Sequence, residues 1–120
     1  MARRQRPESQ VQHAVFQHLA VRAATGTFVF HCPNGGWRSK VEAAIMKSQG
    51  VVPGVPDVIA IRKGEVFALE LKAPGGRLSS AQTDCHGRLR AAGAKVATAV
   101  GIDEAVAVLE EWRILRGKSQ

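Results

Sequence analysis

Two short apolar runs lie next to each other in the middle of the chain, and they constrain its fold more than any other feature. Residues 57–62, DVIAIR, and residues 65–73, EVFALELKA, are rich in Val, Ile, Leu and Phe, and only Lys63-Gly64 separates them. Runs of this length and composition are typical of buried β-strands, and a two-residue connection that ends in glycine is typical of a hairpin. The sequence therefore predicts an antiparallel strand pair, with the first strand in the interior of a sheet.

The rest of the chain alternates between helical and strand patterns, which predicts an α/β fold with a mixed central sheet of about four strands flanked by helices. The predicted order is α-β-(short α)-β-β-α-β-α. The elements outside the hairpin are a helix from Glu8 to Ala24, a strand over 27–31, helical turns from Val41 to Lys47, a helix from Ser79 to Ala92, a strand over 95–100, and a last helix that Asp103 caps and that fades at Gly117.

This order predicts one domain over residues 7–116, between a basic, disordered N-terminus (1–6) and a short tail (117–120). In the last helix, Val106, Leu109 and Trp112 share a face that serves either the core or an interface between subunits. No apolar run approaches the ~18 residues of a membrane span, and the N-terminus lacks the apolar region of a signal peptide. We therefore expect a cytoplasmic protein.

The charge of the chain is strongly basic. Its 120 residues carry 17 Lys and Arg against 10 Asp and Glu, a net charge of +7. An excess of this size on a small domain favours a polyanionic partner, with nucleic acid as the first candidate. The alternative is that the charge only keeps the protein soluble, and composition does not choose between the two.

Three charged residues interrupt the apolar hairpin. Strand alternation places Glu70 and Lys72 on one face of their strand, about 6.6 Å apart, and hairpin pairing places Asp57 near Glu70. Two converging carboxylates make a hard-oxygen site suited to Mg²⁺ or Mn²⁺, and a neighbouring lysine suits phosphate chemistry. Taken singly, Glu-x-Lys is commonly a solvent-exposed face and Pro-Asp a common turn, so the prediction depends on their combination.

These residues resemble a known motif. Pro56-Asp57 followed by Glu70-Leu71-Lys72 resembles the PD-(D/E)xK nuclease motif. The wider pattern comprises ESQVQ from Glu8, then NGG, then KSQGVVPGVPD and ELKAPGGRLSSAQ. It is similar to the virus-type replication-repair nuclease (VRR-NUC) family, from about Glu8 to about Trp112, in the standalone form found in phages and bacteria.

The resemblance implies a restriction-endonuclease-like core and metal-dependent hydrolysis of DNA phosphodiesters, with Mg²⁺ or Mn²⁺ and no organic cofactor. It further implies a structure-selective endonuclease, a homodimeric four-way (Holliday) junction resolvase acting on branched DNA in repair. The alternatives are a flap, nicking or restriction-like nuclease, or a DNA-binding accessory protein without turnover. The implied roles are metal ligands at Asp57, Glu70, the Leu71 carbonyl and Glu8, a catalytic lysine at Lys72, and a lysine- or phosphate-orienting glutamine at Gln82.

Several residues have a second interpretation. Ser79-x-x-Gln82 is also a helix capping box, and Glu8 is also a favourable first-turn acid. Trp37 either stacks on a base or packs under its loop. The basic and glycine-containing loops predict DNA contacts at Asn34, Gly36, Arg38, Lys40 and Arg77. We expect His13, His18, His31 and His86 to be surface or half-buried residues, with His31 near the site.

Overall fold

The computed structural model describes residues 7–33 and 39–117, and for Pro7 and Glu8 only the backbone. The expected disordered segment (1–6), most of the tail (117–120) and the loop residues 34–38 lie outside this part. The described elements are α1 (Pro7–Arg22), β1 (Thr27–His31), α2 (Lys40–Ser48), β2 (Val58–Arg62), β3 (Glu65–Lys72), α3 (Ser80–Ala91), β4 (Lys95–Val100) and α4 (Gly101–Glu111). The predicted element order and the α/β class are confirmed.

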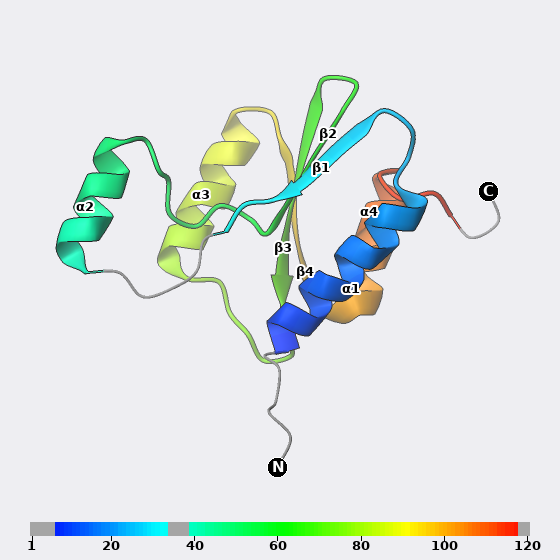
Figure 1. Ribbon diagram of the computed structural model, residues 1–120, viewed down its shortest axis with the longest axis horizontal. Helices are drawn as coiled ribbons and strands as arrows, with labels where there is room; N and C mark the ends of the chain where they lie inside the picture. Colours follow the sequence, from blue (N-terminus) through cyan, green and yellow to red (C-terminus); the bar gives the residue numbers. More distant parts are fainter. Residues whose placement is uncertain (1–6, 34–38, 118–120) are drawn as a thin grey trace, which may run out of the picture.

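The four strands form one mixed sheet in the order β1-β2-β3-β4. β2 pairs antiparallel with β1 and with β3, and β3 pairs parallel with β4. The predicted hairpin is confirmed, with Val58 opposite Leu69 and Arg62 opposite Glu65. Helices α1 and α4 cover one face of the sheet, α3 lies on the other face, and α2 stands beyond α3 (Figure 1).

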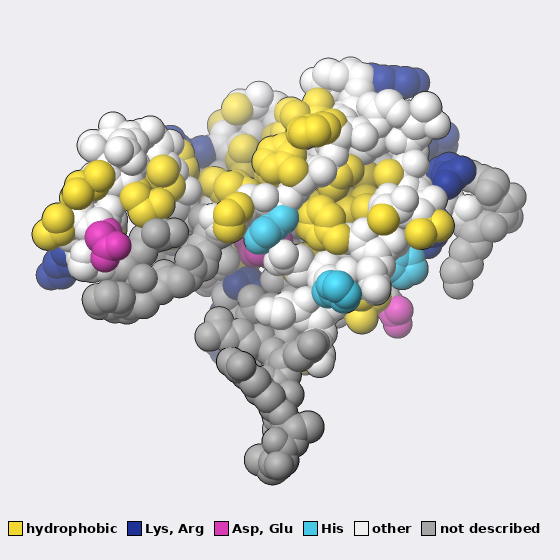
Figure 2. Space-filling model, viewed as in Figure 1, with side chains coloured by type: hydrophobic (Ala, Val, Ile, Leu, Met, Phe, Trp, Pro, Cys, Tyr) yellow, Lys and Arg dark blue, Asp and Glu magenta, His cyan; other side chains and the backbone are white. Residues whose placement is uncertain are grey.

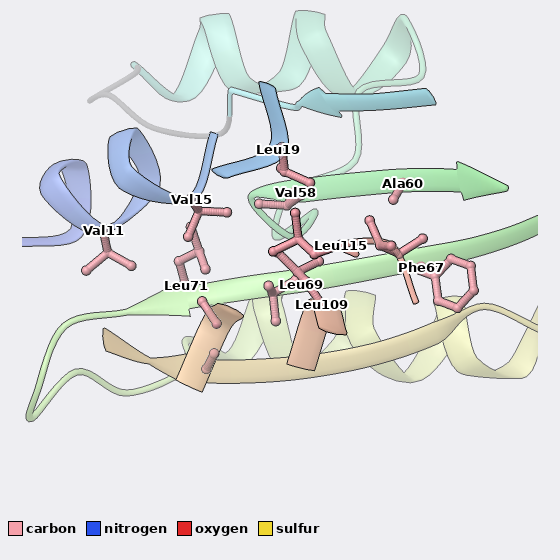
Figure 3. Close-up of a cluster of buried hydrophobic side chains, with 13 residues drawn as sticks. Val11, Val15, Leu19, Val58, Ala60, Phe67, Leu69, Leu71, Leu109 and Leu115 are labelled. Atoms are coloured by element: carbon pink, nitrogen blue, oxygen red, sulfur yellow. The ribbon is translucent and has the colours of Figure 1, made fainter. Parts of the chain in front are cut away.

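The hydrophobic core lies between the sheet and the pair α1 and α4. Alternate residues of β3, namely Phe67, Leu69 and Leu71, point into it and meet the apolar stripe of α1 (Figure 3). Leu109 of α4 is fully buried there, with Val106 and Trp112 packed against the cluster. This face of the last helix therefore belongs to the core. The other core residues are Val11, Val15, Leu19, Val58, Ala60, Ala99, Ala105, Ile114 and Leu115.

The last helix differs from its prediction at both ends. It begins at Gly101 rather than after Asp103, because Gly101 has a φ of +82° and turns the chain directly out of β4. No side chain caps its N-terminal residue, although Glu104 accepts a hydrogen bond from the Val100 N–H at 2.9 Å. It ends at Glu111 rather than near Gly117, and the chain after it re-enters the core.

Among the described residues, no helix is long and apolar enough to cross a membrane.

The strands were predicted to within one residue at each end, whereas the first helix ends two residues before the predicted Ala24. The difference there is local, since Ala23 leaves the helix to form an isolated bridge with Leu115.

A substitution at Leu69 tests the assignment of the hydrophobic core. Its side chain is 0% exposed, so Leu69→Ala should lower the free energy of unfolding by about 2–5 kcal/mol through lost burial and a residual cavity. Val21→Ala is the control, because Val21 is 73% exposed and should change stability by less than about 0.5 kcal/mol. Urea unfolding followed by circular dichroism measures both, and equal effects would contradict the assigned core.

Candidate active site

Asp57 joins the loop before β2 to the end of β3. Its carboxylate Oδ2 accepts a hydrogen bond from the Leu71 N–H at 2.8 Å. Its carbonyl oxygen lies 2.7 Å from His31 Nδ1, which donates because a carbonyl only accepts. The predicted proximity of Asp57 to the Glu70 strand is confirmed, and so is the position of His31 beside the site.

Glu70 and Lys72 project together from the sheet face opposite the apolar core. Glu70 is 2% exposed and Lys72 is 8% exposed. This burial excludes the interpretation of Glu-x-Lys as a solvated strand face. Burying charged groups is costly unless partners satisfy them, so the partners of these two side chains define the site.

Gln82, in the first turn of α3, is the partner of Lys72. The Lys72 ammonium donates to Gln82 Oε1 at 3.1 Å, and the Ser79 N–H donates to the same oxygen at 2.8 Å. Ser79 Oγ accepts from the Gln82 N–H at 3.1 Å, which completes a capping box. The capping box is confirmed, and the same side-chain oxygen that caps the helix also accepts from Lys72, as an orienting role for Gln82 would require.

His86, in the middle of α3, is a site residue that the sequence analysis missed. It was expected to be at most half-buried, but it is 1% exposed, with Nε2 3.1 Å from Glu70 Oε1. Burial lowers the pKa of His86, the positive charges of Arg90 and Lys72 lower it further, and Asp57 acts in the opposite direction. The available signal was its spacing of four residues from Gln82, which places both on one side of a helix.

Glycines let two loops approach the site closely. Gly54 has a φ of +85°, and a Cβ at this position would lie 2.4 Å from the Ala81 carbonyl oxygen. The loop that leads to Asp57 therefore rests on the first turn of α3. After β3, a Cβ at Gly76 would lie 3.0 Å from the Ala73 carbonyl oxygen and 3.4 Å from the Lys72 Cδ, so this loop packs closely beside the lysine.

The other predicted site residues either make no contact with Asp57, Glu70 or Lys72 that the structure records, or lie outside the described part. Arg77 is exposed in the loop between Lys72 and α3. Lys40 is exposed at the start of α2, which stands away from the sheet (Figure 1). α1 begins at the end of the molecule where β3 finishes (Figures 1 and 3). The Glu8 side chain and the residues Asn34, Gly36, Trp37 and Arg38 lie outside the described residues.

The donor set suits a hard cation. Asp57 and Glu70 supply carboxylate oxygens, and Mg²⁺ is commonly held by one or two carboxylates while it keeps several waters. Among the described side chains, those of residues 9–33 and 39–117, no group of three or more His, Cys, Asp and Glu is arranged to hold a metal ion. The chemistry of Asp57 and Glu70 fits a cation that shares its coordination with water and substrate.

The chain resembles solved structures over most of its length. A structure described as a VRR_NUC domain protein superposes with a TM-score of 0.74 at 24% sequence identity, covering 92% of this chain and 90% of the other. A second, described as a VRR_NUC domain, gives a TM-score of 0.61 at 19% identity, covering 90% and 99% of the two chains. At these identities the likeness establishes a shared fold. No curated protein matches the sequence.

Residues 2–102 match the family model described as the VRR-NUC domain, which implies a nuclease domain of the PD-(D/E)xK type. The match covers most of the chain, and the protein belongs to the VRR-NUC domain family.

Gly54 provides a test of how the site is assembled. Gly54→Ala and Gly50→Ala both place a side chain at positive φ, but only Gly54 faces the Ala81 carbonyl, since nothing lies within 4 Å of a Cβ at Gly50. The shared backbone cost is about 1–2 kcal/mol, and the clash should cost Gly54→Ala about 1–3 kcal/mol more. Urea unfolding of the two variants measures the difference. Equal destabilisation would contradict a packed contact between this loop and α3.

Proposed function

We propose that this protein is a metal-dependent DNA endonuclease that hydrolyses phosphodiesters. Its proposed active site contains Asp57, Glu70 and Lys72. One observation carries the proposal: two acidic residues and a buried lysine lie at the end of the hairpin, and each forms a hydrogen bond with another part of the fold. The family membership and the net charge of +7 support it further. DNA is the expected substrate.

Asp57, Glu70, the Leu71 carbonyl and Glu8 are the proposed ligands of Mg²⁺ or Mn²⁺. When bound, the ion supplies a Lewis acid next to the scissile phosphate. The described geometry supports the part assigned to Asp57, because the Leu71 N–H fixes its carboxylate against β3. Glu70 presents a second, buried carboxylate one residue before Leu71.

Lys72 is the proposed electrostatic catalyst. Its ammonium has three donors, and Gln82 Oε1 accepts from one of them. The others can donate to phosphate oxygens, where a fixed positive charge stabilises the negative charge that develops in the transition state. Because the lysine is buried and held by Gln82, little of its side-chain freedom is lost when DNA binds.

The proposed substrate is branched DNA, bound by a homodimer that resolves four-way junctions. A twofold dimer presents two sites to a twofold-symmetric junction. A hydrophobic patch supports self-association. It lies on the face of β1 and β2 that points away from the core (Figure 2). In this patch Phe28 is 65% exposed, and Phe30 and Ile61 are each 38% exposed. Contiguous apolar patches of this kind mark interaction surfaces.

Arg77 is the described residue best placed to contact the DNA backbone, because its exposed loop joins the strand of Lys72 to the helix of Gln82. Lys40, Asn34, Gly36 and Arg38 are proposed as further contacts.

We also propose one nuclease domain over residues 7–116 and a cytoplasmic location. A flap, nicking or restriction-like nuclease is the alternative within the same chemistry, and a non-catalytic accessory protein is the alternative outside it.

A cleavage assay tests the activity. Labelled four-way junctions, flaps, splayed arms and linear duplexes are offered with Mg²⁺, with Mn²⁺ and with EDTA. We expect paired nicks in the junction that depend on metal, and a loss of at least about 100-fold in kcat for Lys72→Ala, the scale for removing one preorganised electrostatic group. The control is Lys95→Ala, which removes an exposed lysine of the neighbouring strand β4. Lys95 lies opposite Phe67, and Phe67 is five residues before Lys72 along β3, so the control lysine lies away from the site.

The substrates separate the alternatives. Cleavage of flaps or plain duplex in place of junctions would retain the nuclease and reject the resolvase. DNA binding without cleavage under every condition would reject the enzyme and favour the accessory protein. Equal loss in Lys72→Ala and Lys95→Ala would assign the effect to general charge and not to the site.

Metal binding is tested separately by thermal unfolding in the absence of DNA. Mn²⁺ at 100 times its dissociation constant should stabilise the wild type by about 2.7 kcal/mol, and Glu70→Ala should abolish the rise in Tm. The control is Glu65→Ala, which removes an exposed carboxylate from the start of the same strand. A wild type that gains no stability from Mn²⁺ would contradict the proposed metal-binding site.

A further inference from the structure

One side of α3 faces both buried charged residues of β3. Gln82 contacts Lys72 and His86 contacts Glu70. Residues four apart on a helix rise about 6.0 Å along its axis, and residues two apart on a strand span about 6.6 Å. The two spacings match, so a single helix that runs opposite to the strand can supply one partner to each charged side chain.

The contact of His86 with Glu70 is buried on both sides. Their side chains are each 2% exposed, and Nε2 lies 3.1 Å from Oε1. An ionised Glu70 only accepts hydrogen bonds, so Nε2 of His86 carries the proton of this contact.

Nδ1 of His86 is buried and has no hydrogen-bond partner among the described residues. A buried polar nitrogen without a partner costs free energy, whereas an apolar side chain of similar size would fill the same space without that cost. Packing alone therefore does not account for histidine at this position. The Nε2 contact with Glu70 does, because no apolar residue could make it.

We propose that His86 is a positioning residue, whose Nε2–H fixes the Glu70 carboxylate in the orientation that binds the metal ion. The inference rests on the proposed function, because it assigns Glu70 as a ligand. Carboxylates that bind metals are commonly oriented by hydrogen bonds from a second layer of residues, and loss of such a partner typically lowers metal affinity 10- to 100-fold. In this arrangement α3 orients both site residues, the lysine through Gln82 and the glutamate through His86.

The test measures the affinity of the folded protein for Mn²⁺ by isothermal titration calorimetry, without DNA. His86→Gln retains an amide donor at the place of Nε2, whereas His86→Asn places its amide nearer Nδ1 and falls short of Glu70. His86→Leu removes the donor. We expect His86→Asn and His86→Leu to weaken Mn²⁺ binding by about tenfold or more, and His86→Gln to remain within about threefold of the wild type.

Cys85→Ala is the matched control, since Cys85 is buried next to His86 on the same helix. It should bind Mn²⁺ as the wild type does, even if it loses stability. If His86→Leu does not fold, the comparison of His86→Gln with His86→Asn decides the result, and circular dichroism confirms that both are folded.

The outcomes separate this inference from the proposed function. Wild-type Mn²⁺ binding that Glu70→Ala abolishes, but that His86→Asn and His86→Leu leave unchanged, would overturn the positioning role alone. Equal weakening in His86→Gln and His86→Asn would also overturn it, because a retained donor would then have no value. A wild type that does not bind Mn²⁺ would overturn the proposed metal site and this inference with it.

Discussion

The burial of two charged side chains in β3 is the constraint on which the rest of this structure depends. β3 is paired on both edges, and Glu70 and Lys72 lie near its end with almost no exposure. An ionised group in such a place is tolerated only when hydrogen bonds or opposite charge satisfy it. A helix must therefore lie against this face and carry polar groups at the correct spacing. α3 meets this requirement with Gln82 and His86.

The position of Asp57 follows from the same constraint. Its carboxylate is held by the backbone of Leu71, between the two charged residues of β3, and its own backbone is held by His31. The loop before it reaches this place only because Gly54 can lie directly against the first turn of α3. A loop, a strand and a helix that are distant in the sequence therefore meet around one small volume, and each is fixed there by at least one contact with another.

The sequence predicts strand features well because their determinants are local. Alternation along 65–72 separates Glu70 and Lys72 from Phe67, Leu69 and Leu71, and the short turn fixes the register that brings Asp57 to Leu71. The contact of His86 with Glu70 was not predictable in this way. Helical phase shows that Gln82 and His86 share a side, but it does not show what that side faces. The start of α4 was also missed, because an ordinary capping rule favoured Asp103, whereas Gly101 in the left-handed region begins the helix directly after β4.

The two faces of the sheet are held by different forces, and this difference bears on the location of the site. α1 and α4 bury a continuous apolar cluster against one face. α3 buries only Cys85 and His86, and two of its links to β3 are the hydrogen bonds to Lys72 and Glu70. Apolar burial stabilises a fold without regard to orientation, whereas hydrogen bonds fix geometry and add modest net stability. The stability of the domain can therefore reside on the first face, which leaves the second free to hold buried charged groups whose geometry is fixed by hydrogen bonds at some cost in stability.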